Sequence, residues 1–264
     1  MTSWDLLSSG PADAEHTVVL VPGSLCTAVF YADLMAEPSL AAIRLVAATL
    51  PGQGGTPPAG DPSIENYARL IGELAADLGA QVLVGHNTGG AVVLETAATG
   101  AFSGPLVLLA PSLSRKDEPL APRVLDRLST VLGHLPFALM LKFIGQMLKG
   151  GIPEHRQDEF AAVLGGNDPR LVRRHMRLYL RYLDRHGSVA RRLCESGART
   201  WLVYGEQDEV GTTDDERAIL DNCPTTTVHT LAGTGHMIPN MRPDFVADLI
   251  TQALHENPSR QARN

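Results

Sequence analysis

The sequence lacks basic runs, a cysteine framework and any long hydrophobic segment. Its net charge is −7 and no stretch is strongly basic, so we expect no nucleic-acid partner. The cysteines Cys26, Cys194 and Cys223 are scattered and odd in number, which indicates neither a metal site nor a disulfide framework and fits a reducing compartment. No apolar run approaches the roughly 20 residues of a membrane span, and the N-terminus shows no signal-peptide pattern. We therefore expect a cytoplasmic protein without a membrane partner.

The chain is long enough for one α/β domain with an insertion. It has 264 residues, of which 44% are hydrophobic. Short β-rich apolar runs alternate with stretches of helical periodicity, which predicts a parallel sheet with right-handed crossovers. The expected strands are 17–21, 44–50, 81–84, 105–110, 200–204 and 226–231. The expected helices around them are 28–35, a helix capped by Ser63 that runs to residue 78, 88–99, 214–221 and 243–255.

One long segment interrupts this alternation. From residue 114 to residue 198 only helical patterns occur, separated by Pro, Gly and Asn-Asp-Pro breaks. The expected helices are 120–132, 136–148, 154–164, 169–186 and 188–196. We therefore divide the chain into a core, residues 1–113 and 199–264, and a helical cap, residues 114–198, over the carboxyl ends of the strands. Open α/β sheets bind their ligands at that edge.

A sharp turn is expected at Asn87, between the strand that ends near Val84 and the next helix. The segment Gly85-His86-Asn87-Thr88-Gly89 has the outline of a nucleophile elbow, Gly-x-Ser-x-Gly, with an amide at the tip. The flanking positions must be small, because a Cβ at 85 or 89 would collide with the neighbouring strand or helix. An amide is not nucleophilic near neutral pH, so we expect no acyl-enzyme at Asn87.

Two further groups follow in an order that suits catalysis. Asp208 stands four residues after Tyr204, just past the end of an expected strand, and His236 follows another strand in Gly233-Thr234-Gly235-His236. Glu206, Glu209 and Asp214 are alternative candidates for the same carboxylate role as Asp208, with Glu209 the second choice. The order along the chain is thus elbow, carboxylate, histidine.

These three motifs resemble the α/β-hydrolase fold family. The resemblance extends from about Thr17 to Leu254. It implies a mostly parallel, eight-stranded-type sheet flanked by helices, with a helical cap inserted after the sixth strand. The chain departs from the family pattern at Pro22-Gly23, where His-Gly is usual, and at Asn87, where Ser, Asp or Cys is usual.

The resemblance also implies roles for site residues. Asp208 would orient His236, and the backbone N–H groups of Ser24 and Thr88 would form an oxyanion hole. We expect His86 to support the elbow and Cys26 to be a packing residue, since nothing near it would lower its thiol pKa. Packing or surface roles are also expected for four residues that could reach the pocket, Tyr31, His134, His155 and His175.

Without a hydroxyl at the tip, the remaining groups suit non-covalent chemistry. His236 paired with Asp208 is a competent general base, and backbone N–H groups stabilise an oxyanion or enolate. We therefore favour general acid/base catalysis of the lyase, cyclase or isomerase type, or attack by His-activated water. Three alternatives stay open: a serine ester hydrolase inactivated by Asn87, an Asp-nucleophile dehalogenase or epoxide hydrolase with Asp changed to Asn, and a non-catalytic ligand-binding protein.

The expected ligand is a small hydrophobic metabolite with a carbonyl group. A Leu- and Met-rich cap favours a bulky apolar compound, such as an aromatic or polyketide-like product of secondary metabolism. The sequence contains no phosphate loop and no metal-ligand cluster, so we expect no cofactor and no metal. A homodimer is left open.

Overall fold

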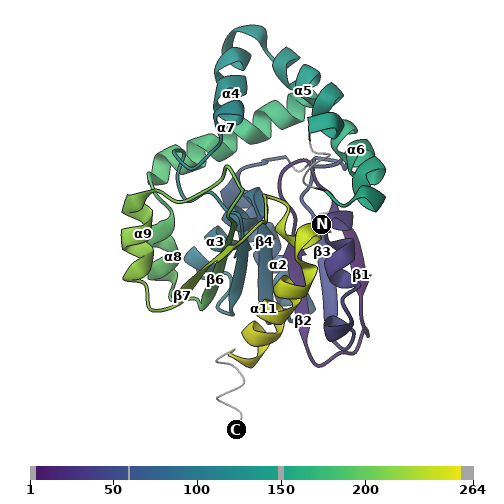
Figure 1. Cartoon of the computed structure of the whole chain (residues 1–264), viewed down its shortest axis with the longest axis vertical. Helices are drawn as coiled ribbons and strands as arrows, with labels where there is room; N and C mark the ends of the chain where they lie inside the picture. The colour runs from purple at the N-terminus through teal and green to yellow at the C-terminus, as the bar shows by residue number, and fades with distance from the viewer. Residues whose placement is uncertain (1–3, 59, 148–151, 257–264) are drawn as a thin grey trace.

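A computed structural model describes residues 4–58, 60–147 and 152–256 (Figure 1). They form one seven-stranded sheet with helices on both faces. The strands are β1 (Asp5–Ser9), β2 (Thr17–Val21), β3 (Arg44–Thr49), β4 (Val82–His86), β5 (Leu106–Leu109), β6 (Thr200–Gly205) and β7 (Thr226–Leu231). Their order across the sheet is β1-β3-β2-β4-β5-β6-β7. Every neighbouring pair is parallel except β1 and β3, so the expected parallel sheet is confirmed.

The central strands are buried on both faces, as their continuous apolar runs predict. Val18 and Leu20 of β2 point into a core formed with the C-terminal helix, whereas Val19 and Val21 point into a second core on the opposite face. This two-residue alternation places one side-chain cluster on each face of the sheet. The core helices are η1 (Ala28–Tyr31), α1 (Ala32–Met35), η2 (Pro38–Leu40), α2 (Ile64–Leu78), α3 (Thr88–Ala98), α9 (Asp214–Asp221), α10 (Ile238–Met241) and α11 (Pro243–His255).

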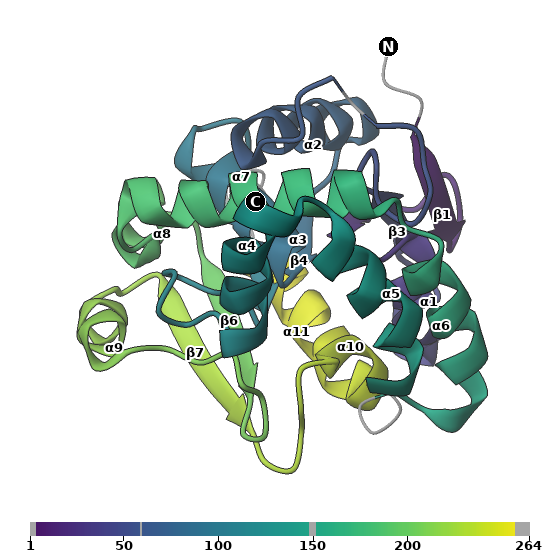
Figure 2. The ribbon, with the colours of Figure 1, turned by 90° about the horizontal axis from the view of Figure 1, so that it is seen from above.

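Between β5 and β6 the chain leaves the sheet and forms the helical cap. Its helices are α4 (Leu120–Leu132), α5 (Leu135–Met147), η3 (Glu154–Arg156), α6 (Gln157–Gly165), α7 (Pro169–His186) and α8 (Ala190–Ser196). Figure 1 shows α4 to α7 above the carboxyl ends of the parallel strands, and α8 beside α3. Seen from above in Figure 2, α4 and α5 diverge in front of the long helix α7.

Several details differ from the sequence-based expectations. The described residues form seven strands rather than eight, and the cap follows the fifth of them. The edge strand β1 was not expected, because its sequence Asp-Leu-Leu-Ser-Ser is short, polar and mostly exposed. The expected helix 136–148 begins one residue earlier, and its last expected residue lies outside the described part of the chain.

The expectation of unpaired cysteines was wrong for two of the three. Cys194, in α8, and Cys223, after α9, form a disulfide with their Cα atoms 5.6 Å apart. Their separation of 29 residues along the chain hides this proximity, which arises because α8 and α9 pack side by side. Cys26 is free and buried, and burial raises the pKa of its thiol to about 12, as suits a packing residue. No helix in the described part of the chain is long and apolar enough to cross a membrane.

Candidate active site

Asn87 occupies a strained turn between β4 and α3. Its φ of 49° and ψ of −119° lie in a region that residues with a side chain rarely adopt. The turn depends on its flanking glycines, since a Cβ on Gly85 would meet the backbone of Gly89, and a Cβ on Gly89 would meet the end of β2 at Val21. The backbone N–H of Asn87 donates to the Leu109 carbonyl on β5. The elbow geometry expected from the sequence is therefore present with an amide at its tip.

His236 and Asp208 lie within hydrogen-bond distance of each other. His236 precedes α10, Asp208 follows β6, and the distance from His236 Nδ1 to Asp208 Oδ2 is 2.8 Å. The Asp208 side chain is 3% exposed and that of His236 is 33% exposed. Asp208 accepts a second hydrogen bond at Oδ1, from the Val210 N–H. The carboxylate fixes the proton on Nδ1, so Nε2 is left as the basic nitrogen of the ring.

The three alternative candidates for the carboxylate, Glu206, Glu209 and Asp214, have other roles. Glu206 accepts a hydrogen bond from the Gly233 N–H and so ties the loop after β6 to the loop before His236. Glu209 lines an open cavity of about 360 Å³ between the loop after β6 and the start of α4. Asp214 is fully exposed at the start of α9 and pairs with Arg217. None of the three contacts the imidazole of His236.

His86 lies beneath His236. Its Nε2–H donates to the His236 carbonyl at 3.0 Å, and the two ring centroids are 4.8 Å apart. Burial, together with repulsion from His236, lowers the pKa of His86 to about 3, so this ring is neutral. Its Nδ1 is buried without a partner, against Gly23. His86 thus holds the backbone of His236 in place and adds no charge to the site.

A chain of hydroxyl groups orients the Asn87 amide. The Thr88 hydroxyl donates to Asn87 Oδ1 at 3.0 Å, and it lies 2.8 Å from the Ser24 hydroxyl. Since the single Thr88 proton goes to Asn87, Ser24 is the donor in the second contact. The Asn87 Nδ2 group bonds to no described residue and is free to donate to a ligand. The backbone N–H groups of Ser24 and Thr88 likewise have no partner among the described residues.

Four polar groups link this site to the cap. The sequence indicated that His175 could reach the pocket, but not that it is hydrogen-bonded to Gln53 and Tyr67. The Leu25 N–H, next to Ser24, donates to Gln53 Oε1 at 2.7 Å, and Gln53 Nε2 donates to His175 Nδ1 at 2.6 Å. His175 Nε2–H then donates to the Tyr67 hydroxyl, which donates to the Pro51 carbonyl. Each donor meets one acceptor, so the tautomer of His175 is determined. The Gly-rich loop Pro51–Gly55 at a strand end was the available signal.

Asn167, between α6 and α7, makes a second link to the same loop. Its Nδ2 donates to the Leu25 carbonyl at 2.9 Å, and its Oδ1 accepts from the Gly54 N–H at 2.8 Å. Leu25 has a φ of 70°, so its backbone is held in a conformation that is unusual for a branched residue. The cap therefore holds both peptide groups of Leu25, directly through Asn167 and indirectly through Gln53.

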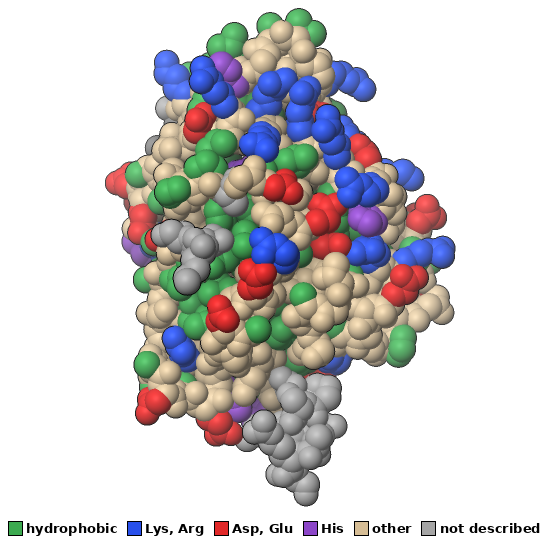
Figure 3. Space-filling model, turned by 180° about the vertical axis from the view of Figure 1, so that it is seen from behind, with side chains coloured by type: hydrophobic (Ala, Val, Ile, Leu, Met, Phe, Trp, Pro, Cys, Tyr) green, Lys and Arg blue, Asp and Glu red, His purple; other side chains and the backbone are tan. Residues whose placement is uncertain are grey.

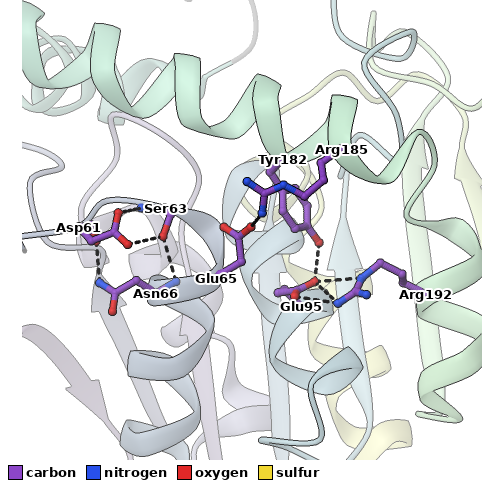
Figure 4. A network of polar contacts seen from close by, with 8 residues as sticks. All are labelled: Asp61, Ser63, Glu65, Asn66, Glu95, Tyr182, Arg185 and Arg192. Carbon is purple, nitrogen blue, oxygen red and sulfur yellow. Dashed lines mark hydrogen bonds and ion pairs between the residues drawn. The ribbon is translucent and has the colours of Figure 1, made fainter.

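The base of the cap is fastened to α3, the helix that begins at the elbow (Figure 4). Glu95 of α3 is buried and accepts two N–H donors of Arg192 of α8 and the hydroxyl of Tyr182 of α7. Arg185 of α7 pairs with Glu65 at the start of α2, where the Ser63 hydroxyl caps the helix as expected. These contacts hold the cap in a defined place over the site.

The remaining residues considered from the sequence do not meet at the elbow. The Tyr31 hydroxyl is buried and donates to the Val21 carbonyl. His155 is largely exposed near Asp33, and His134 lies in the turn between α4 and α5. No group of three or more His, Cys, Asp or Glu side chains among the described residues could hold a metal ion.

The sequence and fold were compared with known proteins. The family model described as the alpha/beta hydrolase family matches residues 18–249. No curated protein sequence matches the chain at a significant level.

Solved structures with the same fold are numerous. A thermophilic esterase from Thermogutta terrifontis has a TM-score of 0.74 at 18% identity, covering 96% of this chain and 93% of its own. A hydrolase from Oleispira antarctica has a TM-score of 0.73 at 13% identity, covering 96% and 94%. A lipase-esterase related protein from Clostridium acetobutylicum has a TM-score of 0.70 at 15% identity, covering 94% and 98%. At such identities the likeness establishes the fold alone.

Proposed function

The chain belongs to the alpha/beta hydrolase family, and on that premise we propose that it moves protons on a small hydrophobic carbonyl compound without forming a covalent intermediate. The reaction would be of the lyase, cyclase or isomerase type. The observation that carries this proposal is the combination of an intact His236–Asp208 hydrogen bond with an amide, Asn87, at the elbow. A base is present and a nucleophile is absent.

The geometry supports specific roles for these groups. His236 Nε2 removes a proton from the carbon next to the substrate carbonyl, and Asp208 stabilises the imidazolium that results. The electron pair of the broken C–H bond forms a C=C bond, and the π electron pair of the carbonyl moves onto its oxygen. That oxygen accepts hydrogen bonds from the N–H groups of Ser24 and Thr88 and from Asn87 Nδ2. His236 then returns its proton to the product or to the leaving group.

A serine ester hydrolase that Asn87 has inactivated is the second candidate. Its structural neighbours favour it, since they include an esterase and a lipase-esterase related protein. The elbow strain also supports it, because this turn presents a nucleophile in acyl-transfer enzymes of the fold. In that case the rest of the machinery would be ready for acyl transfer.

Two assays separate the candidates. The first measures hydrolysis of short activated acyl esters by the unchanged chain, by Asn87→Ser and by Asn87→Ser combined with His236→Ala. The second incubates the unchanged chain in D₂O with a panel of apolar ketones and β-keto compounds and follows loss of the α-proton by NMR. His236→Ala is the test variant there, and His255→Ala, an exposed histidine at the end of α11, is the matched control.

Our proposal predicts that α-proton exchange depends on His236 and not on His255, and that Asn87→Ser yields little ester hydrolysis. Robust hydrolysis by Asn87→Ser that His236→Ala removes, with no proton exchange by the unchanged chain, would instead establish the second candidate. A chain that is silent in both assays but is stabilised against heating by an apolar ligand would be a binding protein, and both candidates would be wrong.

A further inference from the structure

The cap carries an unusually apolar surface. Ten large hydrophobic side chains are exposed among the described residues, and all but Leu6 and Val228 lie on α4, on α5 or at their ends. These eight residues, here called the α4–α5 face, are Leu120, Val124, Leu128, Val131, Leu132, Leu135, Leu139 and Phe143. Val131 is 86% exposed. Scattered apolar residues are normal on a protein surface, but a contiguous patch marks an interaction site.

The spacing of these residues shows that they form one side of each helix. In α4 they recur from Leu120 to Val131 every three to four residues, and in α5 Leu135, Leu139 and Phe143 follow at intervals of four. The other sides of the two helices are already occupied. Phe137 and Leu141 of α5 pack on Val172 of α7, and Leu125 of α4 packs against the same cluster. Each helix is thus apolar on two sides, and only the inner side is needed for the fold.

The same part of the molecule is positively charged. Residues 114–198 contain 15 Lys and Arg and nine Asp and Glu, a net charge of +6, whereas the rest of the chain carries −13. Figure 3 shows Lys and Arg side chains gathered over the upper part of the molecule, with hydrophobic side chains at its top. Exposed cations on α4, α5 and α7 that form no ion pair with a described residue are Arg127, Lys142, Arg170, Arg174 and Arg181. They are available to an external anion.

From this combination we infer that the α4–α5 face docks on an anionic lipid surface. Amphipathic helices with Leu and Val on one side and Arg and Lys beside them bind in the plane of such a surface. A second copy of the chain is the poorer occupant, because a two-fold contact through this face would bring two caps of charge +6 together. The expected absence of a membrane partner rested on the lack of a spanning segment, which docking of this kind does not require.

Vesicle sedimentation tests the inference with the full chain. Vesicles of phosphatidylcholine alone are compared with vesicles that also contain phosphatidylglycerol. The test variant is Val131→Glu combined with Leu139→Glu, two exposed positions whose side chains the core does not need. The control is Val228→Glu, which adds a carboxylate at another exposed valine, on β7 and outside the cap. Circular dichroism and light scattering report folding and oligomeric state.

We expect binding to the anionic vesicles only, weakened at least tenfold by the double substitution and by 0.5 M NaCl, and unchanged in Val228→Glu. Absence of binding by the unchanged chain, or equal binding by the double variant, would overturn the inference. If the unchanged chain is a dimer that binds no vesicle and the double variant is a monomer, a second copy covers the face and the lipid assignment is wrong. None of these outcomes depends on the proposed reaction.

Discussion

Protonation of His175 should break the link between the cap and the loop that carries Ser24. Burial, with a smaller contribution from Arg174, lowers the pKa of His175 from its ordinary 6.5 to about 4. In the folded chain Nδ1 accepts from Gln53, whose Oε1 holds the Leu25 N–H. A proton on Nδ1 would face the Gln53 NH₂ group and remove this acceptor. Acid should therefore loosen the Leu25 backbone before the chain unfolds.

The pKa shift fixes the size and sign of the effect on stability. The neutral folded form contributes stability that is fully present above pH 6.5 and is lost as the pH falls toward 4, because the unfolded chain binds a proton there that the folded chain does not. A shift from 6.5 to about 4 corresponds to about 3 kcal/mol of unfolding free energy. Across this window the contribution of His175 changes by about 1.4 kcal/mol per pH unit.

Urea denaturation between pH 7 and pH 4 measures this contribution as a difference between variants. His175→Gln cannot titrate, so its unfolding free energy should fall less steeply with acid than that of the unchanged chain. His255→Gln, at an exposed position, should keep the original slope. Histidine NMR signals would locate the proton directly. If His175→Gln and the unchanged chain lose stability in parallel down to pH 4, the hydrogen-bond assignment of His175 is wrong.

Three other predictions concern an ion pair, a buried carboxyl group and the disulfide. Arg192→Ala should lower the unfolding free energy by about 3 kcal/mol in urea denaturation, because it leaves the buried Glu95 carboxylate without its charge partner; Arg191→Ala, at the exposed neighbour, is the control and should change little. Asp117, just before α4, is buried, and burial together with the neighbouring Glu216 raises its pKa to about 7. Its contribution to the unfolding free energy should therefore fade as the pH rises from about 4 to 7, because the folded chain holds a proton there that the unfolded chain has lost. Asp117→Asn should abolish that dependence in urea denaturation. Thiol titration of the unfolded chain should find one free cysteine before reduction and three after it. Reduction should lower the unfolding free energy by about 3.5 kcal/mol, since the disulfide closes a loop of 29 residues.

The parts of the molecule that depend on local sequence could be predicted. Strand runs, helix periodicity and the Gly85–Gly89 turn are set by residues within a few positions of one another, and the structure has them within one or two residues of the expected bounds. Asp208 and His236 were identified because each follows a strand in a parallel sheet, which brings their loops to the same edge.

Contacts between distant segments could not be predicted in the same way. Gln53 and His175 are 122 residues apart, and nothing near either residue identifies the other. The same holds for Glu95 and Arg192, and for the disulfide, since each needs the packing of α8 on the core to be known first. The edge strand β1 was missed for the opposite reason, because its five residues carry little apolar signal of their own.

Two features of the site lower the stability of the folded chain and thereby bear on its function. A non-glycine residue with the backbone of Asn87 costs of order 1–3 kcal/mol, although Asn tolerates positive φ better than most residues do. Asp208 keeps a carboxylate away from water with only two hydrogen-bond donors, and such buried charges are often replaced by apolar residues without loss of stability. A protein that only bound an apolar ligand would be more stable without the strained turn and without the buried carboxylate. Their presence together therefore favours a site in which His236 is protonated and deprotonated during a reaction.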